Sequence, residues 1–87
     1  MSGVIKWDLD AWEDYIFWQT ADKGNLRRIN QLIRDISREP FEGIGKPEPL
    51  KGSLLGFWSR RIDKEHRLVY VVEGEDILII SCRGHYE

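Results

Sequence analysis

The apolar positions in the first part of the chain predict a short strand followed by a helix. Residues 4–7 read Val-Ile-Lys-Trp, which is rich in strand formers. Either Asp8 or Asp10 can then cap a helix, because its carboxylate accepts free backbone N–H groups of the first turn. The apolar side chains that follow recur at helical spacing in two neighbouring stripes: Leu9, Trp12 and Ile16 in one, and Ala11, Tyr15 and Trp18 in the other.

A second helix is predicted between residues 26 and 38. Its apolar side chains have the spacing of one helix face, which comprises Leu26, Ile29, Leu32, Ile33 and Ile36. Pro40 disfavours helical backbone at Glu39, so the helix is expected to end near Arg38. Residues 22–25 break the pattern, and a link this short makes the two helices antiparallel neighbours.

The second half of the chain changes from helical to strand patterns. Residues 40–56 contain seven Gly or Pro in seventeen positions and predict a long, ordered surface loop, a kind of segment that is usually functional. Three strands are predicted over 57–62, 66–72 and 77–83, and the short turns between them are typical of an antiparallel meander. We therefore predict an α+β fold, an antiparallel sheet with both helices on one face and the other face open for function.

Length and composition limit the class of protein. The 87 residues suffice for a single domain spanning 1–87, and 41% hydrophobic with 32% charged residues is a globular composition. No apolar run approaches the roughly 20 residues that span a bilayer, and the N-terminus is not that of a signal peptide. One cysteine and two histidines argue against a disulfide framework or a structural zinc site. We expect a reduced, cytoplasmic protein.

The charges are distributed unevenly along the chain. Residues 23–67 carry eleven basic and six acidic side chains, whereas residues 1–22 carry one basic and five acidic. A basic middle segment indicates a local anion-binding surface on a protein whose net charge is −2. The alternative is that these lysines and arginines only solvate a helix face.

Two arginines are candidates for binding an anion. If the turn at 63–65 has three residues, Arg61 lies directly opposite Arg67 on one sheet face, and Arg60 points to the other face. Facing like charges are destabilising unless they are solvated or share an anion, and a phosphate fits the guanidinium fork. In the alternative interpretation, each arginine binds a carboxylate such as Asp63 or Glu65.

Other candidate groups are scattered through the chain. His85, at the end of the last strand, can act as a general acid near neutral pH, or it can be an exposed tail residue. Glu48, held between two prolines and near lysines, can act as a general base, or it can be an ordinary loop residue. His66 is a weaker candidate because no partner motif is evident, and Cys82 is expected to be a buried strand residue.

One reaction would use these groups together. Cleavage of RNA without a metal needs a base for the 2′-hydroxyl proton, cations for the developing phosphorane charge, and an acid for the leaving 5′-oxygen. A Glu, an Arg or Lys, and a His supply those functions. Aromatic side chains would stack on the bases of single-stranded RNA.

Several longer strings resemble a known family. They comprise residues 40–51 (Pro-Phe-Glu-Gly-Ile-Gly-Lys-Pro-Glu-Pro-Leu-Lys), 56–62, 65–70, 82–83 and 85–86. Through them the chain resembles, over nearly its whole length, the YoeB branch of the RelE superfamily of toxin–antitoxin ribonucleases. The resemblance implies a fold similar to microbial ribonucleases and cleavage of messenger RNA at the codon in the ribosomal A site, which stops translation.

The resemblance also assigns roles residue by residue. It implies Glu48 as the general base, His85 as the general acid and Arg67 as the group that stabilises charge on the scissile phosphate. The remaining assignments are phosphate binding by Lys51 and Arg61, and substrate holding by Tyr86. A 2′,3′-cyclic phosphate end and no metal or other cofactor are implied.

The implied partners are an antitoxin of the YefM kind, the ribosome and its messenger RNA. The antitoxin's C-terminal segment would wrap the toxin and disturb its site, and the complex would bind operator DNA mainly through the antitoxin. A homodimer is also implied, and no membrane. Three alternatives stay open: an inactive module that acts with the antitoxin as a transcriptional regulator, a ribosome A-site blocker that does not cut, and a ribonuclease that cuts naked RNA.

Overall fold

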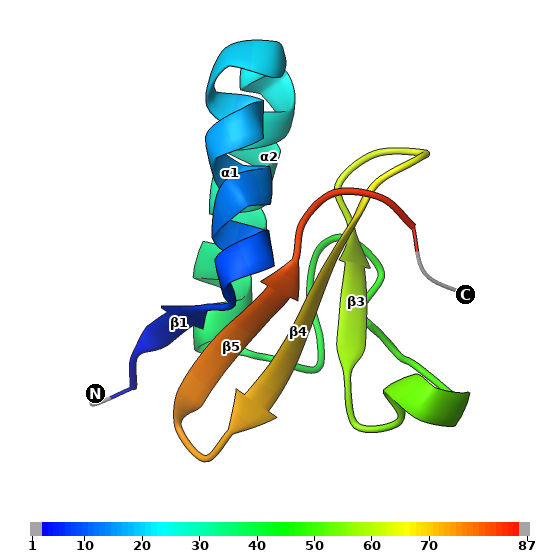
Figure 1. Cartoon of the computed structure of the whole chain (residues 1–87). Coiled ribbons are helices and arrows are strands. Elements are labelled where there is room, and N and C mark those ends of the chain that lie inside the picture. Colours follow the sequence, from blue (N-terminus) through cyan, green and yellow to red (C-terminus); the bar gives the residue numbers. More distant parts are fainter. Residues whose placement is uncertain (1–2, 86–87) are drawn as a thin grey trace.

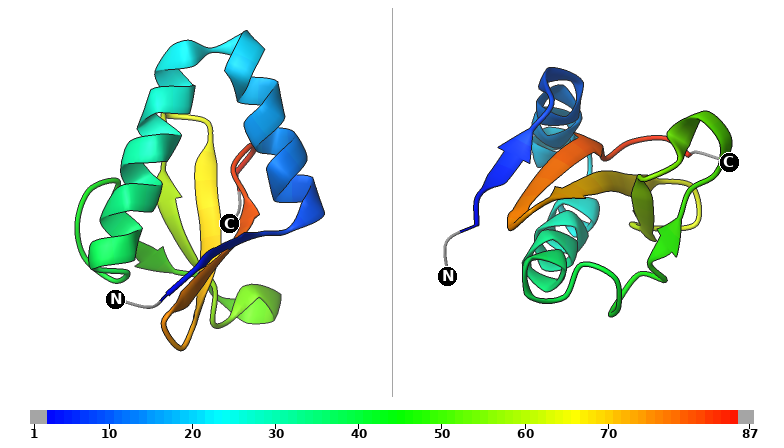
Figure 2. Two further views of the ribbon diagram at one scale, coloured as in Figure 1. Left: turned by 90° about the vertical axis from the view of Figure 1, so that its left-hand side faces the viewer. Right: turned by 90° about the horizontal axis from the view of Figure 1, so that it is seen from below.

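The computed structural model describes residues 3–85 and confirms the α+β class (Figure 1). In chain order the elements are β1 (Ile5–Trp7), α1 (Leu9–Ala21), α2 (Lys23–Arg38), β2 (Glu48–Pro49), the 3₁₀ helix η1 (Gly52–Leu54), β3 (Trp58–Arg61), β4 (Arg67–Glu73) and β5 (Asp76–Ser81). The strands form one sheet in the order β1-β5-β4-β3-β2. Figure 2 shows both helices in front of the same sheet face, and neither covers the other face, as predicted, although Ser59 and Val69 on that face are buried.

The sheet is mixed, so the prediction of an antiparallel sheet is wrong for one strand. The pairs β2–β3, β3–β4 and β4–β5 are antiparallel, but β1 runs parallel to β5, with Ile5 beside Ile77 and Trp7 beside Ile79. The turn lengths that predict antiparallel pairing exist only in the meander. β1 leads into helices, and a crossover of that length lets two strands pair in parallel.

The link between the two helices is shorter than expected. Lys23 and Asn25 already belong to α2, and Asp22 alone forms the link. Its side chain accepts the backbone N–H of Asn25 (3.0 Å) and caps α2, while its own N–H closes α1 on the Trp18 carbonyl. The capping carboxylate thus allows the turn to be shorter than residues 22–25. Within residues 3–85, neither helix is long and apolar enough to cross a membrane.

The core lies between the helices and the covered sheet face. The predicted apolar face of α2 is confirmed, since Ile29, Leu32 and Ile36 are fully buried. Of the two stripes on α1, the one that includes Ala11 and Trp18 faces the core, and the stripe with Leu9 lies outside. The sheet contributes the buried side chains of Leu68, Tyr70, Ile77 and Ile79. Each buried Ile or Leu contributes about 1.5–3 kcal/mol relative to its exposed state.

The segment 40–56 is ordered but less irregular than predicted, because it contains β2 and η1. Pro49 can occupy β2 because this is an edge strand, where a missing N–H need not break a ladder. The three meander strands lie within a few residues of their predicted positions. β5 ends at Ser81, before the predicted residue 83, because Cys82 turns away to contact α1.

A buried ion pair fixes the start of this segment. Arg60 of β3 is fully buried on the helix face of the sheet, and its Nη1 donates to Oδ2 of Asp35 on α2 (2.6 Å). Nη1 also donates to the Ile44 carbonyl (3.1 Å), and Nη2 donates to the carbonyls of Glu39 (2.7 Å) and Glu42 (3.0 Å). Nε donates to the Tyr70 hydroxyl (3.3 Å). The hydrogen bond from Arg60 keeps the pKa of Asp35 below its usual value. These partners satisfy a charge whose burial would otherwise be costly.

We expect this ion pair to make the free energy of unfolding depend on pH in the acid range. The pKa of Asp35 is lowered in the folded state. The carboxylate therefore contributes to the free energy of unfolding above its unfolded pKa of ~3.9, and this contribution is lost as the pH falls through the folded pKa. Urea unfolding from pH 7 to pH 2.5 should therefore show a shallower loss for Asp35→Asn than for wild type. Arg60→Met should cost about 3–5 kcal/mol at pH 7. Glu13→Gln, on the exposed side of α1, is the control, and parallel wild-type and Asp35→Asn profiles would contradict the expectation.

Candidate active site

The open face of the sheet gathers the predicted basic and acidic groups. Arg61 lies opposite Arg67 across β3 and β4, as predicted, and the Ile62 N–H bonded to the His66 carbonyl (2.9 Å) closes a three-residue turn. Glu48 lies opposite Ser59 across β2 and β3. Directly opposite residues share a face and alternate residues return to it, so Glu48, Arg61 and Arg67 are on the face opposite to that of buried Arg60.

The two facing arginines form no ion pair with a carboxylate among residues 3–85. Nη1 of Arg67 instead donates to the backbone carbonyls of Asp63 (3.1 Å) and His66 (3.3 Å). Arg61 is exposed at the end of β3. The alternative in which Asp63 or Glu65 neutralises each arginine is therefore wrong for this structure, and their positive charge stays available to an anion.

The Asp63 carboxylate is engaged within the turn instead. Oδ1 accepts the backbone N–H groups of Glu65 (2.8 Å) and His66 (2.7 Å), and Oδ2 accepts from the Asn25 side chain of α2 (2.9 Å). Partial burial raises the pKa of Asp63, but these donors outweigh that effect and leave it below its usual value. The turn between β3 and β4 is thereby tied to the start of α2.

Glu48 is carried on the edge strand by a short backbone frame. On one side, the Arg61 N–H donates to the Gly45 carbonyl (2.7 Å), and on the other, the Leu50 N–H donates to Phe57 (2.9 Å). Lys46 adopts a left-handed conformation with φ of 53°, which costs about 1–2 kcal/mol for a residue with a side chain. Such strain recurs at functional sites. Lys51 is exposed and lies just beyond β2, directly before the first residue of η1.

After β5, each of the three residues 82–84 contacts another part of the fold. Cys82 donates its N–H to Asp14 (3.1 Å) and accepts at its carbonyl from Trp18 Nε1 (2.8 Å), both on α1. The Arg83 guanidinium stacks on the Phe17 ring at 3.6 Å. The next residue, Gly84, is bonded to the start of β4, and exposed His85 follows it. Tyr86 lies outside the described residues.

Cys82 is fully buried, as predicted. Burial, with a further contribution from the Asp14 charge, raises the pKa of its thiol to about 12. Burial likewise raises the pKa of Asp14. A thiol of this kind stays protonated near neutral pH and is not a nucleophile.

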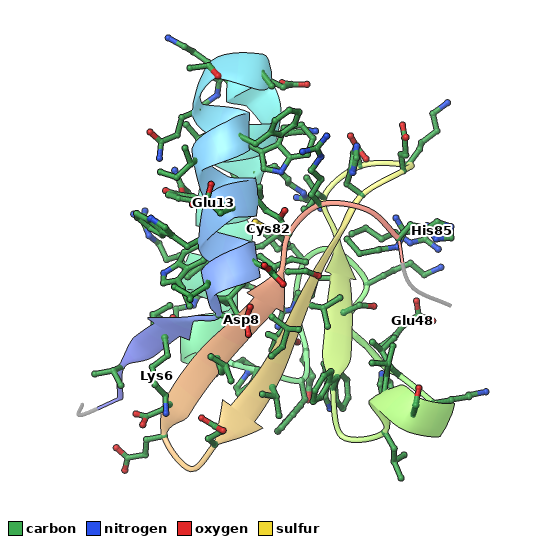
Figure 3. The ribbon with its side chains drawn as sticks, viewed as in Figure 1. Lys6, Asp8, Glu13, Glu48, Cys82 and His85 are labelled. Carbon is green, nitrogen blue, oxygen red and sulfur yellow. The ribbon has the colours of Figure 1, made fainter. Side chains whose placement is uncertain are left out.

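The structure therefore brings the proposed acid and base to one side of the molecule. Figure 3 shows Glu48 and His85 on the same side of the sheet, away from Lys6, Asp8 and Glu13. Arg67 is linked to the His85 segment because its backbone N–H donates to the Gly84 carbonyl (2.8 Å). A carboxylate, a pair of guanidinium groups and an imidazole on this side of the molecule have the chemistry that cleavage of a phosphodiester needs.

Sequence reasoning misses the residues that support this face. It correctly places Arg60 on the face opposite to Arg61, but an arginine on the apolar side of a strand also signals a buried partner, here Asp35. His66 has no partner motif in the sequence, yet its Nδ1 accepts the Gly84 N–H. No local pattern points to that pairing, because the two residues are 18 positions apart.

The fold is shared with small bacterial toxins of known structure. The YoeB/ParE toxin from Agrobacterium tumefaciens is similar in structure, with a TM-score of 0.91 and 52% identity over 94% of this chain and 98% of that one. Residues 7–86 match the family model of the YoeB-like toxin of bacterial type II toxin–antitoxin systems. The toxin YoeB of Escherichia coli K12 is 58% identical over 80 residues, which are 92% of this chain and 95% of that protein. The chain belongs to the YoeB-like toxin family, and the resemblance seen in the sequence is confirmed.

Solved structures of another similar toxin include partners. A heterotetrameric YoeB–YefM toxin–antitoxin complex from Staphylococcus aureus has a TM-score of 0.88 and 49% identity, over 94% of this chain and 95% of that one. A YoeB dimer from the same organism matches with the same values. The similar toxin from Staphylococcus aureus is thus known both in complex with its antitoxin and as a dimer.

We expect Gly45 to be essential for the frame that carries Glu48. A Cβ there would lie 2.8 Å from Cδ2 of Leu32 and 3.2 Å from the Arg60 Cβ, at a φ of +80°. Gly74, with φ of +65° and nothing within 4 Å, is the matched control because it carries only the backbone strain. Gly45→Ala should lose about 1–3 kcal/mol more than Gly74→Ala in urea unfolding. Equal losses would mean that the close packing at Gly45 is not limiting.

Proposed function

We propose that this toxin is a ribosome-dependent endoribonuclease that cuts messenger RNA at the codon in the ribosomal A site and thereby inhibits translation. The observation that carries the proposal is the Arg61–Arg67 pair on the open face, which has no carboxylate partner among residues 3–85. A phosphate is the anion that its two guanidinium groups fit best. Two neighbouring positions support it further: Glu48 lies on β2, which pairs with the strand of Arg61, and His85 follows Gly84, whose carbonyl accepts the Arg67 N–H.

In the proposed reaction, Glu48 takes the proton from the 2′-hydroxyl, whose oxygen attacks the adjacent phosphorus. Arg67 stabilises the negative charge that develops on the phosphorane, and His85 gives a proton to the leaving 5′-oxygen. The products are a 2′,3′-cyclic phosphate and a free 5′-hydroxyl. The protein supplies base, cation and acid itself, so the proposed mechanism uses no metal. Lys51 and Arg61 bind phosphate, and Tyr86 helps hold the substrate.

The proposal extends to partners. We propose that a YefM-like antitoxin binds and inactivates this chain, by similarity to the Staphylococcus aureus complex, and that the chain can form a homodimer, as that toxin does. Operator DNA would be bound by the toxin–antitoxin complex, mainly through the antitoxin. The ribosome as target makes the cytoplasm the site of action.

We expect His85 to be required for cleavage. In a translation reaction with end-labelled messenger RNA, wild type should give cuts in phase with codons, and only when ribosomes are present. His85→Ala should lower the cleavage rate about 10²–10⁴-fold, the usual contribution of a general acid. Stalled ribosomes without cuts, or toxicity that survives His85→Ala, would instead support a blocker. Cuts without ribosomes would support a ribonuclease of naked RNA, and neither cuts nor stalling an inactive regulatory module.

We expect cations of the open face to matter for cleavage, and cations of the helices not to. Arg67→Gln should reduce the single-turnover rate about 10²–10³-fold, because the charge acts on the transition state. Lys51→Ala should mainly weaken substrate binding. Lys23→Ala, an exposed cation on α2, is the matched control and should cleave as wild type does. Equal effects of the three variants would show that general positive charge matters rather than a site.

A further inference from the structure

Gly84, which directly precedes His85, has both of its backbone polar groups bonded. Its N–H donates to Nδ1 of His66 (2.9 Å), and its carbonyl accepts the N–H of Arg67 (2.8 Å). The N–H belongs to the peptide plane before the Gly84 Cα, and the carbonyl belongs to the plane after it. The two bonds therefore fix both planes, and with them the φ of +92° at which the chain turns into His85.

Such a double attachment matters most at a glycine. Without a Cβ, glycine has more accessible backbone conformations than any other residue, so sterics alone leave the direction of the next residue undetermined. The bond to Arg67 fixes only the plane after Cα. The His66 ring fixes the plane before it, and no other group among residues 3–85 accepts that N–H.

The His66 ring is itself held in place. It packs edge-on against Trp18 of α1, with ring centroids 4.8 Å apart and an angle of 79°. Its backbone N–H donates to Asp63 (2.7 Å), and its carbonyl accepts from Ile62 (2.9 Å). An Nδ1 that accepts an N–H does so through its lone pair, which leaves Nε2 as the nitrogen that carries the ring proton.

We propose that His66 is a positioning residue for cleavage: its Nδ1 accepts the Gly84 N–H and so fixes the direction in which His85 leaves the sheet. His66 does not touch the reacting atoms. The proposal rests on the proposed function, in which His85 is the general acid. A general acid must lie within hydrogen-bond reach of the leaving oxygen, and a misplacement of about 1 Å can cost about 10²-fold in rate.

Two nearly isosteric substitutions test the acceptor. In His66→Asn, the side-chain Oδ1 branches from Cγ as Nδ1 of histidine does, so it can accept the Gly84 N–H. The leucine of His66→Leu has nearly the same shape as asparagine but carries no acceptor. On programmed ribosomes, His66→Leu should lower kcat about 10- to 100-fold with little change in KM. His66→Asn should restore kcat to within about threefold of wild type. Equal kcat losses in both variants would overturn the proposal.

A double variant separates positioning from general damage. If His66 acts only through His85, adding His66→Leu to His85→Ala should cause no further loss of rate. A further loss of about tenfold or more would assign His66 a different role. Urea unfolding of each variant serves as the stability control. If His66→Leu fails to fold, His66→Gln, whose amide lies beyond the Nδ1 position, carries the same expectations.

A measurement without activity keeps this proposal distinct from the proposed function. Exchange of the Gly84 amide proton, followed by NMR in the purified protein, should be at least about tenfold faster in His66→Leu than in wild type or His66→Asn. An unchanged exchange rate would overturn the attachment itself. If exchange is faster in His66→Leu but the wild-type protein cuts no RNA, the attachment stands while the proposed function fails.

Discussion

The buried guanidinium of Arg60 is the interaction on which the candidate site depends. It sits in the layer between sheet and helices, where a charge persists only if every polar group around it is matched. Asp35 supplies the opposite charge, and carbonyls of the turn after α2 and the Tyr70 hydroxyl supply the remaining acceptors. One side chain thus joins the central sheet, a helix and a turn rich in glycine and proline. Phe41 of that turn also packs against Trp58 of β3, with ring centroids 4.8 Å apart, and the Pro40 carbonyl accepts from the Tyr70 hydroxyl.

The site is supported from two independent sides. On one side, the turn held by Arg60 delivers the Gly45 carbonyl to Arg61 and so brings the edge strand of Glu48 alongside β3. On the other side, α1 and His66 hold the segment that ends in His85. The facing arginines lie between the two supports. The proposed acid and the proposed base are therefore carried by separate peripheral segments, and the facing arginines are carried by the central sheet (Figures 1 and 3).

The sequence predicts those parts of the structure that local rules determine. The three-residue turn between β3 and β4 sets the register, so the sequence predicts the facing pair of Arg61 and Arg67 on the condition that the turn has this length. The direction of β1 does not, because it depends on a crossover rather than a turn. The roles of Arg60 and His66 also escape prediction. Each depends on a partner far away in the chain, and spacing patterns carry no information about such pairs.

The edge position of Glu48 has a consequence for self-association. An exposed strand edge normally invites another strand, because its unpaired N–H and carbonyl groups can extend the ladder. Pro47 and Pro49 lack N–H groups, and the charge of Glu48 between them adds to the obstacle. The prolines that stiffen this segment thus also close the β2 edge to aggregation and to added strands. Any growth of the sheet is directed to β1, at the far end of the strand order, so association through the sheet would leave the open face clear.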